Sequence, residues 1–135
     1  LATSGTVFVS MNDRDKTAMV PVVKDLQSLG FRVVATSGTR EVLLENGCEN
    51  IDLVLKIHEG RPHVIDWIKN DLIQFIVNTP SGEESQNDGR QIRRTALDYK
   101  LPIITTIAGA KATVAALKSL QSQPLEVKAL QDYLA

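Results

Sequence analysis

The sequence predicts a three-layer, doubly wound α/β domain in which helices cover both faces of a mostly parallel, five-stranded sheet. Short apolar runs of strand length alternate along the chain with stretches of helical periodicity. Such alternation is typical of βαβ units, whose crossover helices pack on the sheet. The 135 residues are enough for one domain with a buried core, and 43% of them are hydrophobic.

Five apolar runs are predicted to be strands because they are short and rich in β-branched residues. They span residues 6–11, 31–35, 51–55, 72–77 and 101–106. Pro102 is compatible with the last run because it stands at the start of the strand.

Helices are predicted where apolar residues recur at helical spacing or helix propensity is high. They span about 14–29, 39–46, 64–70, 92–99, 110–117 and 125–133. Pro21 requires the first helix to start near Arg14–Thr17, so that the missing N–H lies close to the first turn. Gly60 and Pro62 break the periodicity, which predicts a loop over 56–63. A polar segment, 83–90, leads into the helix over 92–99.

Composition excludes several classes of protein. The net charge of −1 argues against a basic nucleic-acid interface. No apolar run is long enough to span a membrane. Cys48 is the only cysteine, which rules out an intrachain disulfide and is typical of a reducing compartment. We therefore expect a cytoplasmic protein with residues 1–4 as a linker remnant and 5–135 as the domain.

A turn between a strand and a helix carries the first functional signal. Thr36-Ser37-Gly38-Thr39 follows the strand over 31–35 and precedes a helix. A helix start offers unpaired N–H groups and the positive end of the helix dipole. With hydroxyls and a glycine beside them, such groups form a binding site for a phosphate, although a plain helix cap would have the same sequence.

Polar residues also follow the other predicted strands. In parallel α/β sheets, ligands bind outside the carboxyl ends of the strands, so we expect these residues to converge. They are Asn12–Lys16, Thr36–Thr39, Lys56, Asn78–Gly82 and Thr105 onward. The set contains lysines, hydroxyls, an amide and glycines, but no obvious nucleophile–base pair. It predicts a site that holds a phosphate and breaks no bond.

The sequence lacks the zinc-protease, P-loop and dinucleotide-binding motifs. His58 and His63 are five residues apart and separated by Gly60 and Pro62, so they do not form the helical zinc signature of a metalloprotease. Gly109–Thr113 lacks the residue order of a P-loop, and there is no Gly-x-Gly-x-x-Gly dinucleotide fingerprint.

Four runs resemble a known family. They are Gly30–Thr39, Lys56–His63, Ile76–Gly82 and Ile92–Lys100. Across nearly its whole length the chain resembles the methylglyoxal-synthase-like domain family, and within it the C-terminal regulatory domains of bacterial-type carbamoyl phosphate synthetase large chains.

The resemblance implies a domain that binds nucleoside monophosphates and regulates a distant ligase, with UMP inhibiting and IMP activating. It implies no cofactor in this domain, because ATP, Mg or Mn and potassium belong to the synthetase domains. The implied partners are the effector, the other domains of the large chain and a glutaminase small chain. A homo-oligomer contact is also compatible, whereas no nucleic acid or membrane is implied.

The site residues carry over position by position. Those matching phosphate-holding residues are Lys16, Thr36, Thr39 and Lys56. Those matching the adjacent loop are Asn78, Thr79, Ser81 and Gly82. Ser37 and Gly38 complete the turn, and no catalytic or metal-binding residue is carried over.

Departures from the family pattern leave alternatives open. The family's enzymes carry His-Asp pairs after the first and fourth strands, where this chain has Met11-Asn12-Asp13 and Asn78–Ser81. A lyase acting on dihydroxyacetone phosphate is one alternative, and a pure oligomerisation domain is another. Ile103-Ile104 replaces a Tyr-Asp pair that contacts the activator ornithine in some bacterial enzymes. Pro80 removes a hydroxyl, and Glu83 stands where a basic residue can occur.

Overall fold

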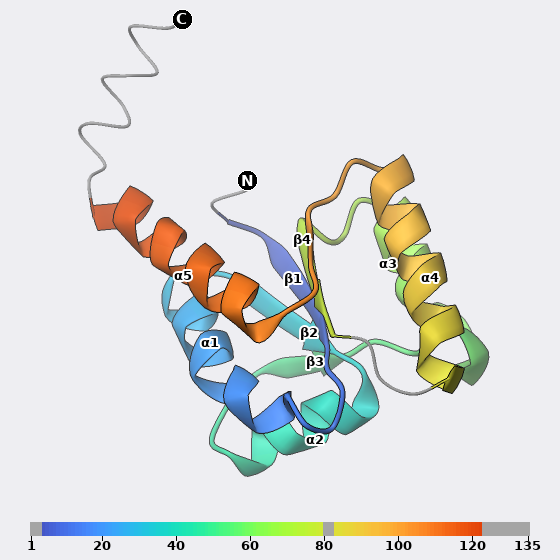
Figure 1. The fold of residues 1–135 in the computed structure, drawn as a ribbon, viewed down its shortest axis with the longest axis horizontal. Helices are drawn as coiled ribbons and strands as arrows, with labels where there is room; N and C mark the ends of the chain where they lie inside the picture. The colour runs from blue at the N-terminus through green and yellow to red at the C-terminus, as the bar shows by residue number, and fades with distance from the viewer. Residues whose placement is uncertain (1–3, 80–82, 123–135) are drawn as a thin grey trace, which may run out of the picture.

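The computed structural model describes residues 4–79 and 83–122, which form one parallel sheet flanked by helices (Figure 1). The strands are β1 (Thr6–Ser10), β2 (Arg32–Ala35), β3 (Ile51–Leu53), β4 (Phe75–Asn78) and β5 (Ile103–Ile104). The sheet has five strands in the order β3-β2-β1-β4-β5, and every neighbouring pair is parallel. The predicted fold class is confirmed.

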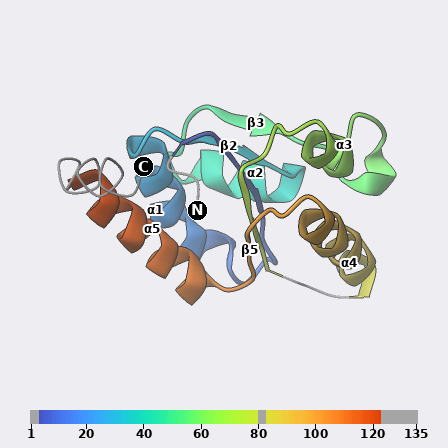
Figure 2. The same ribbon diagram turned by 90° about the horizontal axis from the view of Figure 1, so that it is seen from above.

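Helices cover both faces of this sheet. They are α1 (Lys16–Ser28), α2 (Ser37–Glu45), α3 (Val64–Lys69), α4 (Glu83–Asp98) and α5 (Ile107–Ser122), with a short 3₁₀ helix, η1, over Ile57–Glu59. Seen from above, α1 and α5 lie side by side on one face, and α3 and α4 on the other (Figure 2). The molecule therefore has the three layers that the sequence predicts.

The alternation of side chains along each strand supplies a separate core on each face. Val7 and Val9 of β1 belong to the core beneath α1 and α5, whereas Phe8 belongs to the core beneath α3 and α4. Phe31 and Phe75 meet edge to face in the first core, with ring centroids 5.5 Å apart. The central strands are buried on both faces, which is why they read as continuous apolar runs.

Element boundaries differ from the predicted ones in several places. Helix α1 begins at Lys16, within the range that Pro21 requires. Helix α2 begins at Ser37. The predicted loop over 56–63 contains η1, and α4 extends back to Glu83 through the polar segment.

Neither pattern nor propensity predicts this start of α4, because residues 83–90 contain no apolar residue and include Ser85, Asn87, Asp88 and Gly89, which disfavour helix. Strand β4 starts only at Phe75, β5 has two residues, and α5 is longer than predicted at both ends. The predicted helix over 125–133 and residues 1–3 of the predicted linker lie outside the described residues.

Candidate phosphate-binding site

The strand order changes direction between β1 and β4. From β1 the chain continues outward to β2 and β3, and then returns to place β4 and β5 on the other side of β1. Ligands of open α/β sheets bind outside the carboxyl ends of the strands at such a switch point. The two strands meet there directly, because the N–H of Thr79 donates to the carbonyl of Ser10 at 3.1 Å.

A row of polar side chains crosses the carboxyl ends of the three central strands. Ser10 pairs with Asn78 in the register of β1 and β4, and Thr36 follows Ala35, the partner of Val9. The Thr36 hydroxyl donates to the Ser10 hydroxyl at 3.2 Å, and both Thr36 and Asn78 are buried. Ser10 is missing from the predicted site, although its place at the end of a strand is a signal that could have included it.

Two threonines hold the segment that leaves β1. The Met11 N–H donates to the hydroxyl of Thr39 at 3.0 Å, and the Asn12 N–H donates to the hydroxyl of Thr79 at 2.9 Å. Both threonines are buried, and they come from elements on opposite sides of β1. These hydroxyls therefore fix the position of the β1–α1 loop, a structural role that the sequence does not reveal.

Lys16, and more weakly Lys56, act on a carboxylate that follows β1. Lys16 is the first residue of α1, and its Nζ lies 2.5 Å from Oδ1 of Asp13. A Cβ added to Gly38 would lie 3.0 Å from that Nζ, so Lys16 reaches over the first turn of α2. The hydrogen bond and charge of Lys16 lower the pKa of Asp13, and the charge of Lys56 lowers it further. Lys16 and Lys56 thus both act on one carboxylate at the strand ends.

Helix α4 approaches this region from the other face of the sheet. A Cβ added to Gly89 would lie 3.0 Å from Nη1 of Arg93 and 3.6 Å from Nδ2 of Asn78. Gly89 is buried, so the absence of a side chain there lets these two groups come close. Arg93 is a basic group near the site that sequence reasoning did not include in it.

We call the residues that the structure brings together here the strand-end site. They are Ser10, Lys16, Thr36, Gly38, Thr39, Lys56, Asn78 and Thr79. Ser37 is exposed in the first turn of α2, and the predicted Ser81 and Gly82 lie outside the described residues. Of the expected residues from Thr105 onward, Thr106 accepts from the N–H of Gly109 at 2.9 Å and serves as a helix cap.

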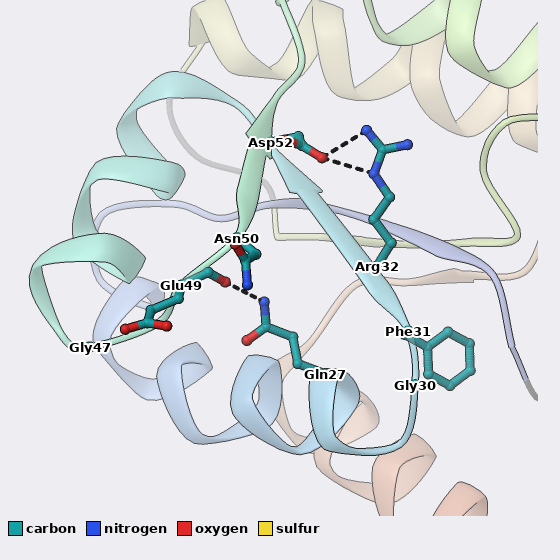
Figure 3. Close-up of a pocket in the computed structure, with 8 residues that line it drawn as sticks. All are labelled: Gln27, Gly30, Phe31, Arg32, Gly47, Glu49, Asn50 and Asp52. Atoms are coloured by element: carbon teal, nitrogen blue, oxygen red, sulfur yellow. Dashed lines mark hydrogen bonds and ion pairs between the residues drawn. The ribbon is translucent and has the colours of Figure 1, made fainter.

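An open hollow lies at the opposite end of the sheet (Figure 3). Its lining residues are Gln27, Gly30, Phe31, Arg32, Gly47, Glu49, Asn50 and Asp52. Two interactions cross it: Arg32 pairs with Asp52 at 2.7 Å, and Gln27 donates to the carbonyl of Glu49 at 2.6 Å. These contacts link α1 and β2 to the segment that carries β3, so the polar groups of the hollow hold neighbouring elements together.

Other chemistry-bearing groups lie elsewhere. Cys48 is buried in the core beneath α1, and burial raises the pKa of its thiol. His58 lies in η1, while His63 precedes α3 and accepts from the N–H of Ile65 at 3.2 Å. Within residues 4–79 and 83–122, no group of three or more His, Cys, Asp or Glu side chains is placed to hold a metal ion. None of the helices in this part of the chain has the length and apolarity to cross a membrane.

Comparison with known proteins identifies relatives. The model of the MGS-like domain family matches residues 18–105. The chain is 77% identical over 134 residues to the carbamoyl phosphate synthase large chain of Synechocystis sp., covering 99% of this chain and 12% of that protein. It is 49% identical over 134 residues to the chloroplastic, arginine-specific large chain of Oryza sativa, covering 98% of this chain and 11% of that protein. The chain thus spans about an eighth of these relatives.

The solved structures include a relative in fold. Methylglyoxal synthase from Elizabethkingia anophelis matches with a TM-score of 0.68 at 16% sequence identity, covering 84% of this chain and 79% of that one. At this identity the match concerns the fold alone.

Proposed function

This chain belongs to the MGS-like domain family, and from that membership we propose that it is the effector-binding domain of a carbamoyl phosphate synthase large chain. Its ligand is a nucleoside monophosphate such as UMP or IMP, whose phosphate occupies the strand-end site. The rest of the large chain carries the ligase activity, with its ATP and metal ions, and associates with a glutaminase small chain in the cytoplasm.

The observation that carries this proposal is the convergence of cations and buried polar groups at the switch point. Lys16 and Lys56 act on the same carboxylate, beside the first turn of α2. Hydroxyl and amide groups at the ends of β1 and β4 and at the N-cap of α2 gather at the same strand ends. Lysine ammonium groups, hydroxyls and helix N–H groups are the donors that a phosphate dianion requires.

The chemistry of the site supports binding over catalysis. Proton abstraction beside a carbonyl needs a general base with a pKa near the working pH. Asp13 is the carboxylate at the lysines, and Lys16 holds its pKa below the usual range, which makes it a weak base. The His63–Asp66 pair belongs to the start of α3, where Asp66 is bonded to Arg61 and to the N–H of His63. A sensor of phosphate ligands fits these residues better than a lyase does.

Regulation would follow from differential affinity. A nucleotide that binds one arrangement of the synthetase more tightly than another shifts activity toward that arrangement. A coupling free energy of about 1–3 kcal/mol, typical of allosteric pairs, is sufficient.

Isothermal titration calorimetry of this chain with UMP and with IMP tests the binding function. We expect saturable heat with at least one nucleotide and no conversion of dihydroxyacetone phosphate to methylglyoxal. In the full large chain that contains this segment, the same nucleotide should change the rate of carbamoyl phosphate synthesis. Absence of binding together with turnover of dihydroxyacetone phosphate would replace the proposal with the lyase.

A further inference from the structure

We infer that Asp13 is an internal counter-anion of the strand-end site, which an incoming phosphate must displace from Lys16 in order to bind. The inference rests on the proposed function and adds to it a residue that sets affinity. Asp13 is not among the residues that match the family's phosphate-holding positions.

The two members of the pair are anchored very differently. The Lys16 side chain is only 15% exposed, whereas that of Asp13 is 96% exposed, and Nζ lies 2.5 Å from Oδ1. Lys16 is held by its surroundings, including the close approach to Gly38. Asp13 sits in the turn before α1, in which the Asp15 N–H donates to the side chain of Asn12 at 2.8 Å. The aspartate side chain is therefore free to swing into solvent while the lysine stays in place.

The charges around Asp13 favour this role. Lys16 acts on the carboxylate through a hydrogen bond and its charge, and Lys56 acts through its charge. Both lysines are the predicted phosphate-holding cations, so Asp13 partly neutralises the positive charge that would attract the ligand. The Asp13 carboxylate and an incoming phosphate then compete for the ammonium group of Lys16. The phosphate displaces the carboxylate because more hydrogen-bond donors surround it in the site.

Replacing the carboxylate by an amide removes the competitor and keeps the shape. Asp13→Asn should therefore bind UMP more tightly, by about 1.4- to 5-fold, which is the range typical of exposed ion pairs. The same gain should be seen with inorganic phosphate, and none with uridine, which has no phosphate. Affinity of the variant should also fall more steeply with salt, because more positive charge is left unscreened.

Asp15→Asn is the matched control, since it changes the same charge within the same turn. No hydrogen bond or ion pair joins the Asp15 side chain to Lys16 among the contacts of the described residues. Titrations of wild type, Asp13→Asn and Asp15→Asn with UMP by calorimetry, and with inorganic phosphate by NMR, decide the question. We expect tighter binding of both probes by Asp13→Asn and less than a 1.4-fold change in Asp15→Asn.

The possible outcomes distinguish a failure of the counter-anion role from a failure of the proposed binding function. If wild type binds UMP and Asp13→Asn binds it no more tightly, the counter-anion role is wrong and the proposed function stands. An equal gain in Asp15→Asn would reduce the effect to general charge and would also overturn the role. If none of the three proteins binds either probe, both the proposed function and the inference fail. In a Lys16→Ala background, Asp13→Asn should bring no gain, because the pair no longer exists.

Discussion

The two ends of the sheet differ in whether their polar side chains are buried or exposed. At the carboxyl ends, five polar side chains are at least 93% buried: Asn12, Thr36, Thr39, Asn78 and Thr79. At the amino ends, the hollow is lined by exposed charged groups such as Arg32 and Asp52, which neutralise each other.

The difference shows that a hollow does not by itself locate a binding site. Burial of polar groups costs free energy unless they are hydrogen-bonded, so a group of them at one place needs a reason. At the carboxyl ends some of these groups position the β1–α1 loop, where the exposed Asp13 pairs with Lys16 and also feels the charge of Lys56. At the amino ends, the charges of Arg32 and Asp52 are matched by each other across the hollow.

The largest expected effect is the loss of a lysine at the carboxyl ends. Lys16→Ala should weaken UMP binding about 10- to 100-fold, because hydrogen bonds to charged groups contribute about 1.5–3 kcal/mol. Lys24→Ala is the control on the same helix, since Lys24 lies beside Gly47 at the hollow. Calorimetry measures both affinities, and equal losses would show that the two ends do not differ in function.

Next in size is the loss of a threonine that holds the β1–α1 loop. Thr39→Val leaves the buried N–H of Met11 without its acceptor, so the free energy of unfolding should fall by about 1–3 kcal/mol. Thr36→Val is the control, because its hydroxyl contacts another hydroxyl and serves no backbone group in the described structure. Urea unfolding compares the two variants, and an equally small loss in both would remove the structural role of Thr39.

A smaller effect concerns the segment that carries Lys56. Arg61 lowers the pKa of Asp66 through a hydrogen bond, and the N–H of His63 lowers it further. The ionised carboxylate therefore stabilises the fold above its unfolded pKa of about 3.9, and this contribution is lost as the pH falls toward the folded value.

As the pH is lowered from about 5 to about 2, the urea midpoint of the wild type should therefore fall by more than the midpoint of Asp66→Asn does. Asp66→Asn has no carboxylate at this position to lose. Asp98→Asn, which removes an exposed carboxylate from α4, should behave like wild type. Parallel pH profiles of wild type and Asp66→Asn would show that this pair does not stabilise the segment.

The smallest expected effect is at the hollow. Both side chains of the Arg32–Asp52 pair are 54% exposed, and exposed pairs contribute at most about 1 kcal/mol. Asp52→Asn should therefore reduce the free energy of unfolding by about 1 kcal/mol or less and leave UMP affinity unchanged. Arg32→Ala should cost slightly more, since it also removes the contact of the guanidinium with the ring of Trp67, whose centroid lies 5.5 Å away. A loss of UMP binding in either variant would move a functional role to the amino ends.

Much of the fold follows from local patterns. The strand runs at β1, β2 and β4 are predicted because both of their faces are apolar, and Pro21 correctly limits the start of α1. The least accurate boundaries are at η1 and at the start of α4, where residues 83–88 are helical although none of them is apolar. The residue types of the site are likewise readable, because hydroxyls, an amide and lysines follow strand ends.

By itself, the sequence determined the alternation of strands and helices, which apolar runs form strands, and the chemical class of the residues that follow them. Only the tertiary structure decided that β4 returns to lie beside β1, which brings Ser10 next to Asn78 and Thr79, 68 and 69 positions further along the chain. It also decided that the Thr39 hydroxyl accepts a hydrogen bond from the Met11 N–H and that Asp13 forms an ion pair with Lys16. The physical reason is that periodicity records which face of an element is buried, whereas strand order and side-chain pairing arise from packing between segments far apart in the chain.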